Sequence, residues 1–102
     1  MFPVYRTSLA SADIEEISNF IAQDNLAYSV KFADCVNQTL KFLSANPMAG
    51  KKEYMAGLFQ EIRSFTVNEF RKYRIYYEFN GEKIRVARVL HTARNIPEII
   101  EP

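Results

Sequence analysis

The amino-acid sequence predicts an α+β fold, in which an N-terminal strand and an antiparallel helical hairpin precede a three-stranded antiparallel meander. Both helices are expected to pack on one face of the sheet. Three observations predict this: apolar residues recur at helical spacing over residues 9–45, apolar and polar residues alternate over residues 71–79, and Asn80-Gly81 marks a tight turn. With 102 residues, 48% of them hydrophobic, the chain suffices for one domain with one core, expected to span residues 1–102.

The N-terminal part of the chain predicts a strand followed by a helix. Residues 3–7 alternate between apolar and polar side chains, and a proline is tolerated at the start of a strand. A helix over Leu9–Gln23 follows, with Ser8 as its expected N-cap. Its apolar residues recur every three or four positions, at Ala10, Ile14, Ile17 and Ile21.

A second helix is expected over Leu26–Ala45. Asp24-Asn25 interrupts the first helix, and either residue can cap the next one. Asn46-Pro47 ends the second helix, because a residue before proline is driven out of the helical region. The connection between the helices is so short that the two must lie antiparallel.

The next part of the chain predicts a loop and three strands. Met48–Leu58 has no clear period, so a loop is expected there. Strands are expected over Phe59–Val67, Arg71–Phe79 and Lys83–His91. Asn80-Gly81 predicts a two-residue turn between the last two strands, because both residues tolerate positive φ. A short helical turn is expected within residues 95–100.

The strand over Arg71–Phe79 has an apolar face and a polar face, as expected of a strand with one side toward the helices and one side open. The apolar face carries Tyr73, Ile75, Tyr77 and Phe79, and the polar face carries Lys72, Arg74, Tyr76 and Glu78. In the following strand Ala87, Val89 and Leu90 blur the alternation, and a β-bulge and burial on both faces are equally good explanations.

Charge is unevenly spread along the chain. Residues 1–50 carry three basic and five acidic residues, residues 51–94 carry ten and five, and residues 95–102 add two acids, so the formal net charge is only +1. The basic excess in the second half predicts a basic surface that favours an acidic partner, with ordinary solvated strand faces as the alternative. The low net charge argues against direct nucleic-acid binding.

Several classes of protein are not expected. The single cysteine, Cys35, cannot form an internal disulfide and is predicted to be a small buried or half-buried helical residue. We see no signal-peptide pattern, and no apolar stretch approaches the roughly 20 residues that cross a membrane, so a reducing cytoplasm is the expected location. One histidine and one cysteine make no metal site, and no cofactor is expected.

Basic and aromatic residues on the last two strands form the candidate site. Without a bulge, Arg74, Tyr76 and Arg85 would lie on one open face, where guanidinium groups suit carboxylates or phosphates. An ordinary solvated face with cross-strand ion pairs is the more frequent arrangement. For His91 we favour a residue that ends the strand and hydrogen-bonds a turn over a general acid.

Four stretches in the same order resemble the ParE/RelE superfamily of bacterial toxins, over about residues 4–97. They are Ala12–Ile17 (ADIEEI), Asn46–Gly50 (NPMAG), Tyr73–Gly81 (YRIYYEFNG) and Val89–Pro97 (VLHTARNIP). The resemblance implies the toxin of a type II toxin–antitoxin pair, with growth arrest and plasmid stabilisation as its consequences. Its partner would be a cognate ParD-like antitoxin whose C-terminal segment wraps the toxin.

The superfamily includes two activities, and the residues favour one of them. ParE-like members poison DNA gyrase by binding, whereas RelE-like members cut messenger RNA on the ribosome. Thr92 follows His91 where some of these nucleases carry a tyrosine, and residues 95–102 add no basic group. These departures favour a gyrase inhibitor that is not an enzyme. A ribosome-dependent endonuclease and a non-toxic antitoxin-binding module stay as alternatives.

Each activity has its own expected residues. Contact with gyrase is expected at Arg85, Arg88, His91 and Arg94. Contact with the antitoxin is expected at Lys72, Arg74 and Tyr76. The endonuclease alternative would use Arg63, Arg74 and His91 to stabilise phosphate charge and move protons.

Overall fold

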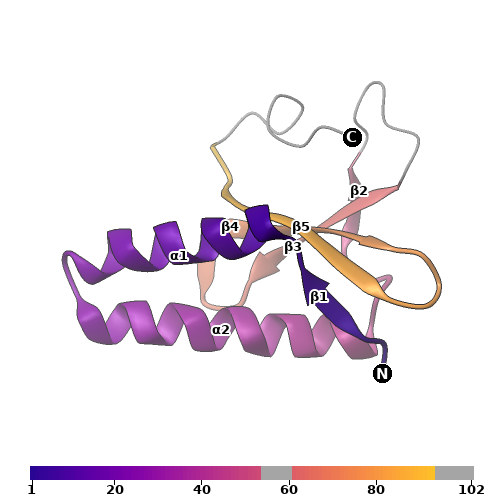
Figure 1. The fold of residues 1–102 in the computed structure, drawn as a ribbon, viewed down its shortest axis with the longest axis horizontal. Helices are drawn as coiled ribbons and strands as arrows, with labels where there is room; N and C mark the ends of the chain where they lie inside the picture. The colour runs from indigo at the N-terminus through magenta and orange to yellow at the C-terminus, as the bar shows by residue number, and fades with distance from the viewer. Residues whose placement is uncertain (54–60, 94–102) are drawn as a thin grey trace.

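A computed structural model describes residues 1–53 and 61–93 and shows one mixed sheet with a helical hairpin on one of its faces (Figure 1). The strands lie in the order β1-β5-β4-β3-β2, with β1 parallel to β5 and the other neighbours antiparallel. This confirms the α+β class. In chain order the elements are β1 (Val4–Arg6), α1 (Ser8–Ala22), α2 (Leu26–Ala45), β2 (Lys51–Glu53), β3 (Ile62–Val67), β4 (Phe70–Phe79) and β5 (Ile84–His91).

The two helices lie antiparallel, as predicted, and α2 has the predicted bounds. Asn25 caps α2 by accepting a hydrogen bond from the backbone N–H of Tyr28. The prediction of Ser8 as the cap of α1 is wrong, because the hydroxyl of Thr7 accepts the hydrogen bond from the N–H of Ala10. Thr7 follows β1 directly and keeps its extended backbone, which is the conformation that an N-cap requires.

The sheet has one strand that the sequence did not predict. β2 lies within the expected loop Met48–Leu58 and pairs antiparallel with β3. Its three residues (KKE) are all charged and too few to alternate, so no periodic pattern marks the strand in the sequence. Residues 54–60 and the expected helical turn at residues 95–100 lie outside the described residues.

The connection between β4 and β5 is longer than predicted. It spans Asn80–Lys83, and of the two residues expected at positive φ only Gly81 has it, with φ 90°. The side chain of Asn80 accepts hydrogen bonds from the N–H groups of Glu82 and Lys83, both at 2.9 Å. An Asx turn therefore closes this hairpin in place of the expected two-residue turn.

β5 contains a bulge, which resolves the ambiguous pattern in its sequence. Tyr76 pairs with Arg88 and Tyr77 with Val86, so Ala87 is the extra residue. The hydroxyl of Thr7 donates to the carbonyl oxygen of Ala87 at 3.0 Å. The bulge is thus fixed by the residue that also caps α1.

The core lies between the helices and the sheet. Phe32, Val36 and Leu43 from α2 are fully buried there, and the apolar face of β4 meets them as predicted, with Ile75 and Tyr77 fully buried. Cys35 is also buried, as expected.

The opposite face of the sheet, which we call the far face, is less open than predicted. Ile62, Tyr76 and Leu90 alternate with core residues along their strands and are only 2–3% exposed. The prediction of an open face is therefore wrong at Tyr76, which the sequence pattern placed on that face.

Candidate binding site

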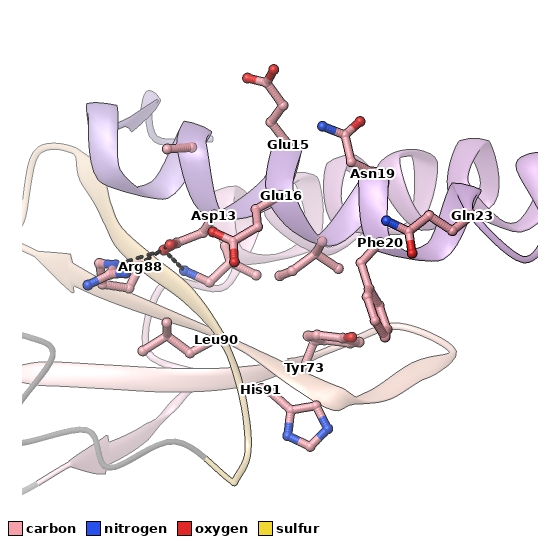
Figure 2. Close-up of a pocket in the computed structure, with 13 residues that line it drawn as sticks. Asp13, Glu15, Glu16, Asn19, Phe20, Gln23, Tyr73, Arg88, Leu90 and His91 are labelled. Atoms are coloured by element: carbon pink, nitrogen blue, oxygen red, sulfur yellow. Dashed lines mark hydrogen bonds and ion pairs between the residues drawn. The ribbon is translucent and has the colours of Figure 1, made fainter.

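A groove of about 690 Å³ lies between α1 and the ends of β4 and β5 (Figure 2). α1 forms one wall because it starts directly after β1, which is the neighbour of β5 in the sheet. The groove is lined by apolar, acidic and amide side chains, namely Ala12, Asp13, Glu15, Glu16, Ile17, Asn19, Phe20, Gln23, Tyr73, Arg88, Val89, Leu90 and His91.

A hydrogen-bonded ion pair joins the two walls of the groove. Arg88 donates from Nε and a terminal nitrogen to the two carboxylate oxygens of Asp13, at 2.7 and 2.8 Å (Figure 2). The same carboxylate accepts the backbone N–H of Val89 at 3.1 Å. Because the Asp13 hydrogen bonds stabilise the charged guanidinium, the pKa of Arg88 is raised further. This contact fixes α1 to the strand just beyond the bulge.

Aromatic rings form the other end of the groove. Tyr73 meets His91 edge to face at 5.3 Å between ring centroids and meets Phe32 of the core at 5.4 Å. Phe20 of α1 is 62% exposed and points toward Tyr73 (Figure 2). Nδ1 of His91 accepts the N–H of Ala93 at 3.1 Å, at the end of β5, as expected of a histidine that terminates the sheet.

The charge left over in this groove is negative. Asp13 and Arg88 neutralise each other, whereas the exposed side chains of Glu15 and Glu16 form no ion pair with any described residue. Asn19 and Gln23 add neutral polar groups to the rim. As lined by the described residues, this groove is therefore acidic and partly apolar, although the sequence suggested a basic site.

Arginine side chains on the far face are held by neighbours within the sheet. Arg74 donates to the hydroxyls of Ser64 and Thr66 at 2.8–3.1 Å, and Ser64 in turn donates to Glu53. Burial raises the pKa of the adjacent Tyr76. The negative charge of Glu53 also raises this pKa, whereas the positive charge of Arg74 opposes the increase. Arg85 forms an ion pair with Glu78 at 3.3 Å.

On the helix-facing side of the sheet, Arg63 and Tyr77 bind the loop that follows α2. Arg63 donates to the carbonyl oxygens of Met48 and Gly50 and forms an ion pair with Glu61. The hydroxyl of Tyr77 donates to Pro47 and accepts from the N–H of Gly50, at 2.8 and 2.9 Å. Burial raises the pKa of Tyr77, against the opposing effect of the Gly50 hydrogen bond.

The structure separates the residues expected for an endonuclease. Arg63 pairs with Tyr77 in the register and faces the helices, whereas Arg74 alternates with core residues and faces away from them. His91 lies at the end of β5, in the groove. These three side chains do not converge on one point.

The other two expected sets are partly brought together. Arg74 and Tyr76 share the far face, and Lys72 is exposed near the start of β4. In the set expected for gyrase, Arg85 pairs with Glu78, Arg88 pairs with Asp13, and His91 contacts Tyr73. The fourth member, Arg94, lies outside the described residues.

The sequence interpretation missed the contribution of α1 to the groove. Leu9, Asp13, Glu16 and Phe20 recur at helical spacing, beside the stripe of core residues rather than on it. Exposed Leu9 and Phe20 on an otherwise polar stripe were the available signal.

Two further findings concern the described residues. Within residues 1–53 and 61–93, no group of three or more His, Cys, Asp or Glu side chains is arranged to hold a metal ion. In the same ranges, no helix combines the length and apolar character needed to span a bilayer.

Among the described residues, Arg63, Arg74, Arg85 and Arg88 have partners within the fold, and the groove beside α1 is lined by acidic and aromatic side chains. A sequence model described as the ParE toxin of the type II toxin–antitoxin system parDE matches residues 4–96. The chain therefore belongs to this toxin family, which confirms the resemblance found in the four sequence stretches.

A solved structure has the same fold. The chain is similar to one from the chromosomal ParDE toxin–antitoxin system of P. aeruginosa, with a TM-score of 0.71 and 20% sequence identity. The similarity covers 89% of this chain and 96% of that chain. No curated protein matches the sequence.

Proposed function

We propose that this toxin arrests growth in the bacterial cytoplasm by binding DNA gyrase, and that a cognate ParD-like antitoxin neutralises it. Membership of the ParE toxin family over residues 4–96 supports the toxin class. The observation that carries binding over RNA cleavage is the separation of Arg63, Arg74 and His91 on different parts of the sheet.

Cleavage of RNA requires a proton-transferring group and a charge-stabilising group within reach of the same phosphate. Arg63 is only 7% exposed and is bonded to two backbone carbonyl oxygens. Arg74 is bonded to Ser64 and Thr66 on the other side of the sheet. An inhibitor that acts by binding needs only a complementary surface, so this arrangement suits it.

The proposed contacts with gyrase are Arg85, Arg88, His91 and Arg94. Of the described three, Arg85 has the most accessible side chain, at 44% exposed, whereas that of Arg88 is 16% exposed. Arg85 and His91 would thus contact gyrase directly, while Arg88 would act mainly by fixing β5 to α1. The proposed contacts with the antitoxin are Lys72, Arg74 and Tyr76.

Expression of the toxin alone tests the proposal, with growth and gyrase supercoiling as the two measurements. We expect growth arrest, relief of the arrest by the antitoxin encoded next to the toxin, and loss of supercoiling by gyrase with purified toxin. Substituting Arg85→Glu should weaken gyrase inhibition, whereas Arg71→Glu, at another exposed strand position, should not.

Two other outcomes would replace the proposal. Cleavage of messenger RNA on the ribosome, with gyrase unaffected, would assign the chain to the endonuclease alternative. Normal growth at a high level of folded toxin would assign it to the non-toxic antitoxin-binding module.

A further inference from the structure

We propose that the groove between α1 and β5 binds a segment of the antitoxin that presents an apolar side chain next to a lysine or arginine. This inference rests on the proposed neutralisation by an antitoxin and adds the site and the chemistry of the bound segment. It differs from the expectation of an acidic partner, because the groove itself is acidic.

Charge is the first argument for a basic occupant. The Asp13 carboxylate is already bonded to Arg88 and to the N–H of Val89. Glu15 and Glu16 are exposed on the same wall, and no described residue forms an ion pair with either of them. Glu16 points into the groove beside Asp13, whereas Glu15 points away from the strands at the rim (Figure 2). A cationic side chain in the groove would thus meet the Glu16 carboxylate directly and be attracted by Glu15 at longer range. The phosphates of a nucleic acid would be repelled by the same groups.

The aromatic wall is the second argument. Phe20 is 62% exposed although it lies on a helix next to buried aliphatic residues, and it points toward Tyr73 (Figure 2). Val89 and Leu90 line the groove at the strand side and are only 1% and 3% exposed. An apolar side chain inserted here would remove Phe20 and its own surface from water, which is the main favourable contribution in protein interfaces.

The position of the groove is the third argument. The N–H of Thr92 donates to the carbonyl oxygen of Lys72 at 2.8 Å, just beyond the end of β5. Lys72 is one of the proposed antitoxin contacts, and its neighbour Tyr73 lines the groove. The groove therefore lies next to one of the proposed antitoxin contacts, and the proposed segment would reach both.

A basic part of the antitoxin would gain more in the groove than an acidic part would gain at the arginines of the sheet. Arg63, Arg74 and Arg85 are each held by hydrogen bonds or ion pairs within the fold. An acidic segment would have to replace those contacts, and the gain would be small. Glu15 and Glu16, by contrast, have no hydrogen bond or ion pair with a described residue that a basic segment would have to replace.

The test is the affinity of the purified antitoxin, encoded next to the toxin, for a set of purified toxin variants. Glu15→Lys/Glu16→Lys should weaken binding about tenfold, because the attraction of the groove for a cationic side chain becomes repulsion. Phe20→Ala should also weaken it about tenfold through the lost aromatic contact. Asp34→Lys is the matched control, an exposed acid on α2 outside the groove, and should change affinity less than about twofold.

Salt dependence separates the charge effect from a folding defect. The gap between wild type and Glu15→Lys/Glu16→Lys should shrink as salt is raised, whereas the gap for Phe20→Ala should persist. Equal or tighter binding by the groove variants, with wild type binding normally, would overturn this inference and leave the proposed function standing. A wild-type toxin that binds no antitoxin would instead overturn the proposed function, and this inference with it.

Discussion

The end of α2 and the groove beside α1 use polar groups in opposite ways. At the end of α2, Arg63 and Tyr77 reach across from the sheet and satisfy the carbonyl oxygens of Pro47, Met48 and Gly50. Each of these side chains is less than 10% exposed and has several partners. We call this cluster the α2 knot. Its arrangement is that of groups which stabilise the fold.

The groove combines one satisfied ion pair with groups that the described fold does not use. Asp13 and Arg88 resemble the α2 knot, with three hydrogen bonds on one carboxylate. Glu15, Glu16 and Phe20 are exposed beside them. The α2 knot therefore consists of side chains with partners inside the fold, whereas the groove leaves an aromatic ring exposed, a feature that is frequent at protein-binding sites.

Among substitutions in these two regions, the largest effect is expected for Gly50→Ala in the α2 knot. A Cβ atom at residue 50 would lie 2.5 Å from the hydroxyl oxygen of Tyr77 and 2.8 Å from its Cε1. The buried tyrosine cannot move aside without losing its hydrogen bonds, so the free energy of unfolding should fall by about 3 kcal/mol. Urea denaturation measures this.

Gly81→Ala is the matched control for that substitution. Gly81 has φ 90°, but a Cβ there would meet nothing within 4 Å. Backbone strain alone should cost about 1 kcal/mol. If the free energy of unfolding falls by the same small amount in both glycine variants, the α2 knot is not tightly packed.

The next largest effect is expected for Tyr77→Phe. Removing this hydroxyl leaves the carbonyl of Pro47 and the N–H of Gly50 without their partner, which should cost about 2 kcal/mol. Tyr76→Phe, one residue earlier on the far face, is the control, because its hydroxyl makes no hydrogen bond with a described residue. It should change stability by less than about 0.5 kcal/mol, and a larger loss would contradict the difference between the two faces.

Burial of Tyr76 and Tyr77 should also make the folded protein less stable at alkaline pH. Burial raises the pKa of Tyr76 and Tyr77 in the folded state, so folding favours their neutral forms. This stabilisation is complete below the ordinary tyrosine pKa of about 10 and is lost as pH rises through the raised value. Chemical denaturation from about pH 8 to about pH 11, a range around the ordinary tyrosine pKa, measures this loss. The free energy of unfolding should decrease less for Tyr77→Phe than for wild type.

The sequence predicted the elements whose periodicity is strong. Apolar residues at helical spacing located α2 to the residue, and alternation located the buried face of β4. β2 was missed because three charged residues have no pattern of their own, and it exists only through pairing with β3. The turn after β4 was mistaken because the Asn80 side chain, rather than two positive φ angles, closes it.

The candidate site was harder to predict than the fold. The sequence shows that Arg63, Arg74, Arg85 and Arg88 are close along the chain, but not that each finds an internal partner. Asp13 is 75 residues from Arg88, and only the parallel pairing of β1 with β5 brings α1 to that strand. The bulge at Ala87 then changes which β5 residues share a face.

Within the groove, Asp13→Asn should have an intermediate effect on stability. An amide keeps the shape of the side chain but removes its negative charge. The Arg88 side chain is only 16% exposed, so its positive charge depends on that partner. The expected loss is about 1.5 kcal/mol by thermal or chemical unfolding. Glu15→Gln, on the same helix, should leave stability within about 0.3 kcal/mol of wild type. If the two substitutions lowered the free energy of unfolding equally, the Asp13–Arg88 ion pair would stabilise the fold no more than an exposed carboxylate does.

Phe20→Ser should have the smallest effect, and it tests whether the groove is a binding surface. At 62% exposure, Phe20 buries little area, and phenylalanine and serine have similar helix propensities. The free energy of unfolding should therefore change by less than about 0.5 kcal/mol, as measured by urea denaturation. Phe32→Ser, in the core at 0% exposure, should instead cost about 4 kcal/mol or prevent folding. A loss above about 1.5 kcal/mol for Phe20→Ser would place this ring among the stabilising contacts of the fold, and the contrast with the α2 knot would then fail.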